Sequence, residues 1–292
     1  MTRRGLILFA SLSIIWGTPY LFIKISVEYL SPGMVIFSRL ILAAIVLVPI
    51  VIAKGQFSAL RGHWRWVFVF AIIEMTFTWW FLAYAEQHIT SSLTGLLIAT
   101  VPIMTALLGK AVGLDDRLTG SRLFGMGIGF AGVIALVGLD VKGTEFLAVA
   151  ALTITALGYA LGPIVIDRKL SSIPALPVIA ASIVINAIIY APIAWFTRPT
   201  APVPASAWWS VVALGLICTA LAFIIFFALI AEVGPSRTTF ITYINPAVAV
   251  ILGVVVLSEP LTWGIVIGFP LVLIGSWMAT RKGPAMESEP HA

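Results

Sequence analysis

The chain has 292 residues, of which 61% are hydrophobic and only 10% are charged. Soluble domains contain roughly 45–50% apolar and about 25% charged residues, so this composition excludes a soluble enzyme and a disordered chain. The net charge of +5 rests on 17 basic residues scattered along the chain, and that scatter argues against a nucleic-acid partner. The composition therefore indicates that the principal partner of the chain is a lipid bilayer.

Apolar runs long enough to cross a bilayer follow one another along the whole chain. A membrane-spanning helix needs about 20 mostly apolar residues, and the segments between the runs are short and rich in turn-forming residues. The sequence therefore predicts an all-α integral membrane protein with ten transmembrane helices. The predicted spans are 5–27, 34–53, 66–86, 91–112, 120–139, 145–166, 175–196, 207–230, 237–257 and 262–280.

The positions of Lys and Arg predict the orientation. With the N-terminus in the cytoplasm, 13 of the 17 basic residues fall on the cytoplasmic side and 4 on the other. The positive-inside rule then places both termini in the cytoplasm, and we expect a bacterial cytoplasmic (inner) membrane. The apolar run after Arg3 and Arg4 lacks a small-residue cleavage site, which favours an uncleaved first span over a signal peptide.

The two halves of the chain resemble each other at a nearly constant offset. Residues Thr18–Lys24 lie 144 positions before Gly162–Arg168, with a proline and a basic residue coinciding, and Pro102 lies 144 positions before Pro246. Ordered matches of this kind predict a duplication. Each half holds five spans, and an odd number makes the halves inverted repeats, as in many secondary transporters. The predicted units are a repeat at 1–140, a repeat at 145–281 and a short cytoplasmic tail at 282–292.

Several short motifs stand out along the chain. They are Trp16-Gly17 with Lys24, Arg39-Leu40 with Ala43, the mid-span prolines Pro102 and Pro246, and Glu259-Pro260 before the last span. With the five-plus-five arrangement, these motifs resemble the EamA-type branch of the drug/metabolite transporter superfamily, over roughly residues 5 to 280. The resemblance implies an exporter of amino acids or other metabolites, and YddG-like aromatic amino acid exporters are the nearest type.

Four of the prolines inside predicted spans are candidates for a role in transport. A proline lacks an N–H group and clashes with the carbonyl four residues earlier, and irregular backbone within a membrane is tolerated where it is buried or lines a cavity. Two interpretations remain open, namely that these prolines are hinges and gates of transport or that they are static kinks. The candidate hinge residues are Pro19, Pro102, Pro163 and Pro246.

Glu74 is the one ionisable residue near the middle of a predicted span. A charge at that depth costs at least about 2.5–3.5 kcal/mol, so its side chain should face protein or water. Glu74 either binds a substrate amine or couples protons, or it is a protonated carboxyl that joins helices by a hydrogen bond. Thr78 and Phe81 follow at i+4 and i+7 and share its helix face, which adds a hydroxyl and a ring to the candidate cavity.

Further candidates for the cavity are polar or aromatic residues that lie at mid-span or beside the prolines. An amide such as that of Asn245 is costly to bury without a partner, so it either caps freed backbone groups or binds substrate. These candidates are Trp16, Thr18, Tyr84, Tyr159, Asn186, Tyr243 and Asn245. Lys24 and Arg39, near outer span ends, could attract an anion, but the usual behaviour of such residues is to snorkel toward the interface.

The favoured function is a secondary transporter that exports small organic solutes by alternating access around a midplane cavity. Amino acids are the favoured substrates, and aromatic amino acids are favoured among them. A nucleotide-sugar, sugar-phosphate or drug transporter on the same scaffold remains an alternative. A channel and an intramembrane lipid-modifying enzyme are less favoured, because neither a filter segment nor a set of paired acids is visible. The protein is therefore not expected to be an enzyme, and no catalytic residue is predicted.

No cofactor or metal site is predicted, because the single cysteine and the three histidines lack ligand spacing. The glycine-rich run 127–132 matches a dinucleotide-binding pattern but follows no strand, so it is interpreted as a helix-packing surface. The G-x-x-x-G spacings at 125–129 and 264–268 let helices approach closely, either within the chain or in a homodimer. A monomer and a homodimer therefore both remain open.

Overall fold

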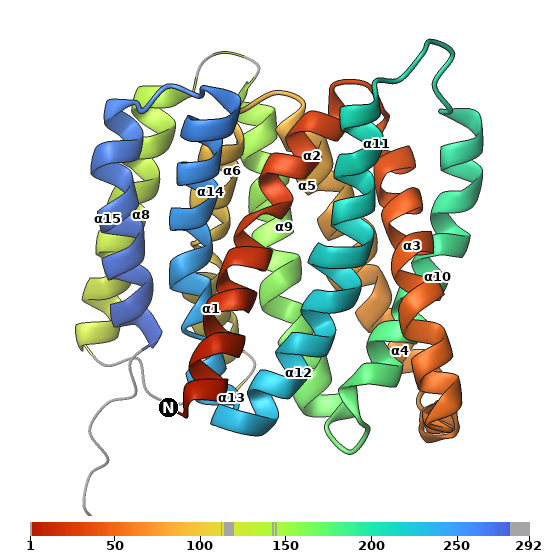
Figure 1. Ribbon diagram of the computed structural model, residues 1–292. Coiled ribbons are helices and arrows are strands. Elements are labelled where there is room, and N and C mark those ends of the chain that lie inside the picture. Colours follow the sequence, from red (N-terminus) through yellow and green to blue (C-terminus); the bar gives the residue numbers. More distant parts are fainter. Residues whose placement is uncertain (1, 112, 114–119, 142, 144, 281–292) are drawn as a thin grey trace, which may run out of the picture.

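The computed structural model describes residues 2–280 except 112, 114–119, 142 and 144, so the predicted tail at 282–292 lies outside the described residues. Within the described part, every regular element is a helix, which confirms the predicted all-α fold. The helices stand side by side in one bundle (Figure 1). Arg3 and Thr280 lie at the same end of the bundle, while the side of the membrane that this end faces stays a prediction.

The described residues of the first repeat form eight α-helices, a 3-10 helix and a π-helix. They are α1 (Arg3–Gly17), α2 (Pro19–Val27), α3 (Pro32–Ala53), the 3-10 helix η1 (Gln56–Leu60), α4 (Trp64–Ala71), the π-helix η2 (Ile72–Phe77), α5 (Thr78–Glu86), α6 (Ser91–Ile98), α7 (Val101–Ala111) and α8 (Gly120–Asp140).

The second repeat contains seven α-helices and two π-helices. They are α9 (Glu145–Val165), the π-helix η3 (Ile166–Leu170), α10 (Ala175–Phe196), α11 (Ala205–Val212), the π-helix η4 (Ala213–Leu221), α12 (Ala222–Val233), α13 (Pro235–Thr238), α14 (Ile241–Leu257) and α15 (Trp263–Thr280).

Nine helical segments of the described chain are long and apolar enough to cross a membrane, and α14, with 17 residues, is shorter. The predicted ninth span, 237–257, therefore begins too early. The chain turns between α13 and α14, where the Thr242 hydroxyl donates to the Thr239 carbonyl at 2.8 Å. A hydroxyl bond of this kind competes with helical backbone bonding, so the threonines favour a turn over a continuous helix.

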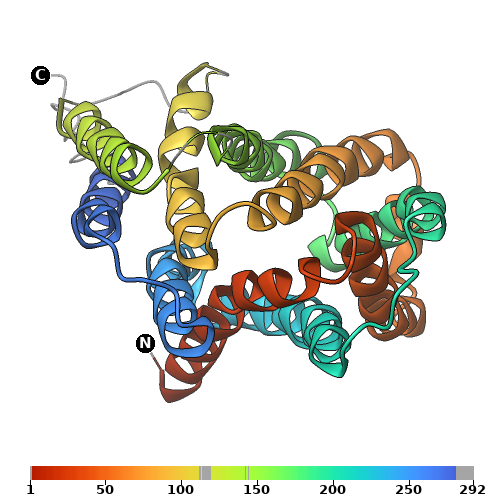
Figure 2. The ribbon, with the colours of Figure 1, turned by 90° about the horizontal axis from the view of Figure 1, so that it is seen from above.

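Helices of one repeat pack on their counterparts in the other. The second spans pair as α3 with α10, the fourth as α6 with α14, and the fifth as α8 with α15. The first span of each repeat packs on the third span of the other, α1 on α12 and α9 on α5 (Figure 2). This reciprocal pairing is what two inverted repeats around a pseudo-two-fold axis produce, so it supports the inverted arrangement.

Glycines let α8 and α15 approach closely. A Cβ at Gly275 would overlap the backbone of Gly129, and one at Gly132 would lie 2.7 Å from the Val272 nitrogen. A Cβ at Gly268 would meet Leu136 and the Gly132 carbonyl. The predicted small-residue surface is thus used within the chain, and a homodimer through it stays a prediction.

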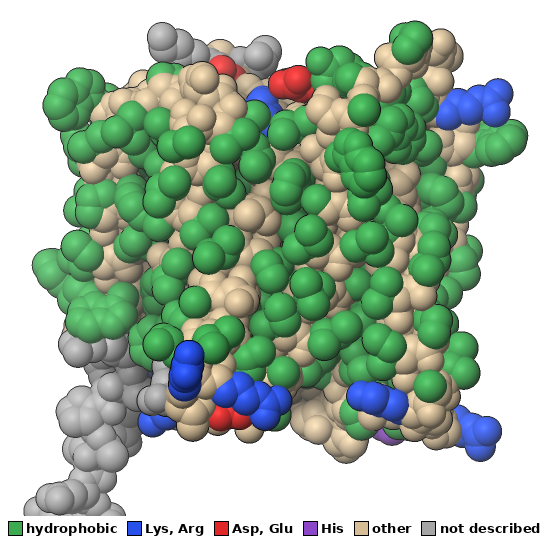
Figure 3. Space-filling model, in the orientation of Figure 1, with side chains coloured by type: hydrophobic (Ala, Val, Ile, Leu, Met, Phe, Trp, Pro, Cys, Tyr) green, Lys and Arg blue, Asp and Glu red, His purple; other side chains and the backbone are tan. Residues whose placement is uncertain are grey.

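The outer surface of the bundle is apolar, as a lipid-facing surface must be (Figure 3). Large hydrophobic side chains stand exposed around it, with Phe196 85%, Val255 73% and Ile134 69% exposed. In Figure 3 the Lys and Arg side chains lie at the upper and lower edges of this band. Exposure on this scale exceeds the apolar patches of soluble proteins, so the helices contact the lipid bilayer.

Glu259 ties the two repeats together at the start of α6. Its Oε1 accepts a hydrogen bond from the Ser91 backbone nitrogen at 2.7 Å. Its Oε2 accepts from the Ser92 backbone nitrogen at 2.9 Å and from the Ser92 hydroxyl. The carboxylate therefore satisfies donors at a helix N-terminus, where the helix dipole favours negative charge.

Replacing Glu259 with alanine is expected to lower the free energy of unfolding by about 1–2 kcal/mol, because two backbone donors of α6 lose their acceptor. Thermal unfolding of the detergent-purified protein measures the effect. The matched control is Glu28→Ala, an exposed acid at the end of α2. Equal melting temperatures for the two variants would show that the cap contributes nothing.

Candidate functional site

Arg39 lies inside the bundle at the contact between the repeats. It is the eighth residue of α3, roughly 10 Å from the start of the helix, and is only 9% exposed. Its guanidinium carbon lies 3.9 Å from the centroid of the Trp79 ring on α5. Its Nε–H donates to the Thr219 hydroxyl on η4 at 2.7 Å. Arg39 therefore joins three spans at one point.

This position corrects the expectation that Arg39 snorkels to the interface. The helix begins at Pro32, because the Ser31 side chain accepts a hydrogen bond from the Met34 nitrogen and caps α3. The guanidinium turns inward because the Trp79 face and the Thr219 oxygen are available there. The sequence carries only a weak signal of this, namely that α3 begins at Pro32, more than a turn before Arg39.

The π-helices position the acceptor of Arg39. A π turn leaves backbone carbonyls poorly bonded, and side-chain donors complete them. In η4 the Thr219 hydroxyl donates to the Leu214 carbonyl at 2.7 Å, which turns its lone pairs toward the Arg39 Nε–H. In η2 the Thr78 hydroxyl donates to the Ile73 carbonyl at 2.6 Å in the same manner. A 144-residue shift places η2 on 216–221, within η4, so both third spans carry this device.

Glu74 lies in η2 against the second repeat. Its Oε2 is buried and has no hydrogen-bond partner among the described residues. A Cβ at Gly162 of α9 would overlap that oxygen, so the carboxyl occupies the space that this glycine leaves. The Tyr159 hydroxyl, one turn earlier on α9, interacts electrostatically with both Glu74 and Arg39 and adjoins the Trp79 side chain. A cation, a hydroxyl and an acid thus share one interior region.

Thr18 completes this region from the first span. The chain breaks between α1 and α2 at Thr18, and the Thr18 hydroxyl donates to the Ile15 carbonyl at 2.8 Å. Pro19 leaves that same carbonyl without a helical donor. The Thr18 hydroxyl also lies 3.2 Å from the Cys218 sulfur on η4. We define the central polar cluster as Thr18, Arg39, Glu74, Trp79, Tyr159, Cys218 and Thr219.

The other two predicted polar candidates in the third and seventh spans serve helix packing. The Asn186 amide donates to the Ala71 carbonyl at 3.1 Å, and its oxygen accepts from the Thr76 hydroxyl at 2.6 Å. Thr78 is fully buried against Gly158, and its carbonyl accepts from the Thr155 hydroxyl at 3.2 Å. These contacts hold η2 in its wide-turn form.

The aromatic candidates are dispersed rather than gathered in one cavity. Trp16 packs on Phe226 of α12 at a centroid distance of 4.9 Å, and Phe81 packs against the main core. Tyr84 lies 4.5 Å from the His88 ring at the end of α5. The Tyr243 hydroxyl forms a hydrogen bond with the Thr280 hydroxyl on α15.

Asn245 bridges the fourth span of the second repeat to the first span of the chain. With its nitrogen facing the acceptors, the amide donates to the Ile241 carbonyl at 2.9 Å and to the Ser13 carbonyl at 3.0 Å. Both bonds go to backbone oxygens, so the amide is occupied by protein. Of the two functions left open for Asn245, the geometry favours the backbone cap.

The four prolines fall into two groups. Pro19 and Pro102 stand directly after breaks, since α1 ends at Gly17 and α6 ends at Ile98. Pro163 and Pro246 lie within α9 and α14, which continue through them. The sequence predicts a bend at each of the four prolines, and the described helices are interrupted only at the two in the first repeat. In a membrane, neighbouring helices can satisfy the freed carbonyls, so a proline does not by itself end a helix.

Two polar groups near the end of α5 have contacts that the sequence analysis did not predict. The Lys24 ammonium donates to the carbonyls of Glu86 at 2.7 Å and Ile89 at 2.8 Å, so it caps the end of α5 instead of snorkelling. The Glu86 side chain is fully buried, and neither carboxyl oxygen has a hydrogen bond among the described residues. Glu86 is the last residue of its span, where a charge ordinarily reaches water, so the sequence carried no signal of its burial.

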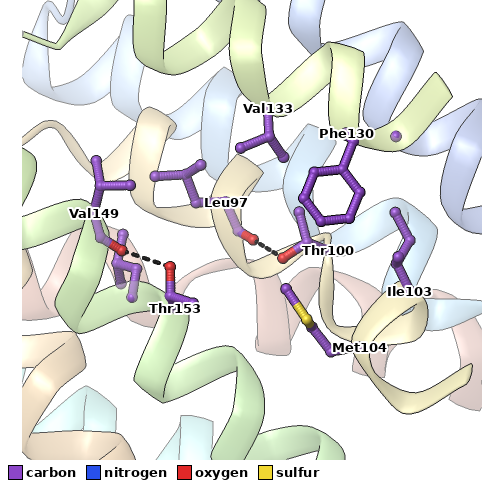
Figure 4. A pocket seen from close by; sticks show the side chains of 10 residues that line it. Leu97, Thr100, Ile103, Met104, Phe130, Val133, Val149 and Thr153 are labelled. Atoms are coloured by element: carbon purple, nitrogen blue, oxygen red, sulfur yellow. Dashed lines mark hydrogen bonds between the residues drawn. The ribbon is translucent and has the colours of Figure 1, made fainter. Parts of the chain in front are cut away.

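A pocket of about 130 Å³ lies at the break between α6 and α7 (Figure 4). Both of its hydroxyls are bonded to carbonyls of their own helices, Thr100 to Leu97 and Thr153 to Val149. The pocket is therefore effectively apolar and separate from the central polar cluster. Its lining consists of Leu97, Thr100, Ile103, Met104, Gly129, Phe130, Val133, Val149, Leu152 and Thr153. The described residues contain no group of His, Cys, Asp and Glu that could hold a metal ion.

The sequence matches the model of the EamA-like transporter family twice, over residues 3–138 and 146–281. The chain belongs to the EamA-like transporter family. The two matches confirm the resemblance noted from the motifs and the presence of two repeats. This EamA-like chain is accordingly a multi-pass membrane transporter, and its family consists of transporters rather than enzymes.

Curated relatives extend over nearly the whole chain. The uncharacterized inner membrane transporter YedA of Escherichia coli is 28% identical over 285 residues, which cover 93% of this chain and 91% of YedA. An uncharacterized transporter of Archaeoglobus fulgidus is 25% identical, with 91% and 95% covered. A probable terminal-alkyne amino-acid exporter of Streptantibioticus cattleyicolor is 26% identical, with 89% and 85% covered. The name of YedA, an inner membrane transporter, supports the predicted location in a bacterial inner membrane.

A solved crystal structure shares the fold of this EamA-like chain. It superposes with a TM-score of 0.69 at 22% identity, over 94% of this chain and 96% of that one. The likeness supports the arrangement of the helices and nothing finer.

Proposed function

We propose that this EamA-like transporter is a secondary transporter that exports amino acids, with aromatic ones favoured, by alternating access. The observation that carries the proposal is Glu74. Its Oε2 is buried without a hydrogen-bond partner among the described residues, where the repeats meet beside the rings of Tyr159 and Trp79. A substrate ammonium supplies the partner that Glu74 lacks, and an apolar substrate side chain packs on the rings.

Two further findings support this choice of substrate. One relative is named a probable amino-acid exporter. A sugar phosphate or nucleotide sugar carries two or more negative charges, and the central polar cluster offers only one basic residue, Arg39, to balance them. A cationic drug remains the second candidate, because it could also use Glu74 and the aromatic rings.

The breaks beside Pro19 and Pro102 are the proposed hinges, while Pro163 and Pro246 act as hinges in this proposal only if α9 and α14 bend in another state. Because Thr18 and the turn at 99–100 interrupt their spans, each half of those spans can tilt without breaking a complete helical ladder. The central polar cluster lies beside the first of these breaks.

Transport by purified protein tests the proposal directly. The protein is reconstituted in liposomes and offered labelled amino acids, a nucleotide sugar, a sugar phosphate and a cationic drug, each as a gradient and in exchange. We expect phenylalanine, tyrosine or tryptophan to move at a higher rate than the other compounds. If no amino acid moves or exchanges, the proposed substrate class is wrong, and transport of the cationic drug alone would establish the second candidate.

A further inference from the structure

We propose that Arg39 binds the carboxylate of the substrate, so that Arg39 and Glu74 hold the two opposite charges of one amino acid. The inference rests on the proposed function and extends it, since it assigns the second pole of the site. It predicts that the transporter selects compounds that carry a carboxylate over amines of the same shape.

The unused hydrogen-bond donors of the Arg39 guanidinium are the first support for this proposal. A guanidinium is permanently charged and has N–H groups on both Nη atoms as well as on Nε. Among the described residues only Nε–H donates a hydrogen bond, to Thr219, and no carboxylate lies within 4.0 Å of the guanidinium. The Nη edge of Arg39 is thus left for a partner from outside the chain.

The energetics of a buried cation point to the same partner. A charge inside the membrane is expensive, and a ring face such as that of Trp79 compensates only part of the cost. A carboxylate on the Nη edge forms two parallel, charge-assisted hydrogen bonds with a guanidinium, which lysine cannot reproduce. A planar anion such as a carboxylate therefore stabilises the buried Arg39 guanidinium most.

The surroundings hold the guanidinium in place for this role. Thr219 is fixed by its own bond to the Leu214 carbonyl, and Trp79 is packed within α5 with 6% of its surface exposed. The Tyr159 hydroxyl on α9 interacts electrostatically with both Arg39 and Glu74. An α-amino acid has its carboxylate and ammonium on one carbon, so in this proposal its two charges bind the Arg39 guanidinium and the Glu74 carboxyl.

Competition experiments on the wild-type protein give the first test. Exchange of labelled phenylalanine in proteoliposomes is measured against unlabelled phenylalanine, phenylalanine amide and 3-phenylpropionate. We expect phenylalanine to compete about 10- to 100-fold more strongly than its amide, which lacks the charged acceptor, and 3-phenylpropionate to compete measurably. Equal competition by phenylalanine and its amide would overturn the inference while leaving amino acid transport intact.

Variants at the cluster give the second test. Arg39→Gln should reduce the ratio of acid to amide affinity to about 1, and Arg39→Lys should give an intermediate ratio. Thr219→Val keeps the charge of Arg39 and removes the hydroxyl that accepts its Nε–H bond, so it should also lower the ratio of acid to amide affinity. This variant replaces Arg39→Gln if the latter does not fold. The matched control is Arg198→Gln, because Arg198 also stacks on a tryptophan, Trp195, but is exposed. An unchanged ratio in the folded Arg39 and Thr219 variants would refute the assignment.

A binding measurement separates this inference from the proposed function. The melting temperature of the purified protein is recorded with phenylalanine, phenylalanine amide and 3-phenylpropionate, independently of transport. If no amino acid is transported, the proposed function fails, yet a larger shift with the two carboxylates that is lost in Arg39→Gln still supports the anion site. Equal shifts with the acids and the amide would refute Arg39 as that site.

Discussion

Gly275→Leu is expected to prevent the fifth spans of the two repeats from packing, and little folded protein should be recovered. A side chain at Gly275 would overlap the backbone nitrogen and Cα of Gly129, and its Cβ would lie 2.6 Å from the Gly125 carbonyl. Backbone atoms cannot rotate aside as side chains can, so α8 and α15 would have to separate. Overpacking of this kind costs about 3 kcal/mol or more.

Size-exclusion chromatography of the detergent extract measures this effect as the yield of monodisperse protein. Gly127→Leu is the matched control, because Gly127 lies on the exposed face of α8 and a Cβ there meets nothing within 4 Å. We expect the control to give nearly the wild-type yield. A well-behaved Gly275→Leu protein with wild-type stability would contradict the close contact of the two helices.

Glu74→Gln is expected to lower the rate of amino acid transport by about 10- to 100-fold, since a hydrogen bond to a charged group is replaced by one between neutral groups. The pH dependence of transport should change with it, because the titratable group is removed. Proteoliposome exchange at several pH values measures both effects. Unchanged activity and an unchanged pH profile would assign Glu74 a structural role.

Gly162→Ala tests the same carboxyl without altering its chemistry. The added methyl group would overlap the Glu74 Oε2, which lies at the end of a flexible side chain, so the carboxyl should move and the protein should still fold. We expect transport to fall with little change in melting temperature. Gly138→Ala, where a Cβ meets nothing within 4 Å, is the control. Wild-type transport by Gly162→Ala would show that the position of the carboxyl is unimportant.

The helices of this protein could be predicted because each span must be apolar and about 20 residues long. The Ala175–Phe196 helix matches its predicted bounds, whereas the ninth span differs because threonine hydroxyls compete for its first carbonyls. The sequence could not show which prolines break a helix. Helices are interrupted at Pro19 and Pro102 and continue through Pro163 and Pro246, because neighbouring helices decide whether a freed carbonyl finds a donor.

The candidate site was predictable only in part. Glu74 stood out as an acid at mid-span, and the structure brings Tyr159 and Thr18 to the same region. Arg39 was placed wrongly because the depth of a long side chain depends on which way it turns, and that depends on Trp79 and Thr219 from distant parts of the chain. The contacts that occupy Asn186 and Asn245 are long-range for the same reason.

The matching π-helices η2 and η4 indicate whether the π-helix or the duplication of the repeats came first. A π turn arises when one residue is inserted into an α-helix. Because the third span of each repeat carries such a turn at the equivalent position, a single insertion before the gene was duplicated accounts for both, whereas a later origin requires two separate insertions.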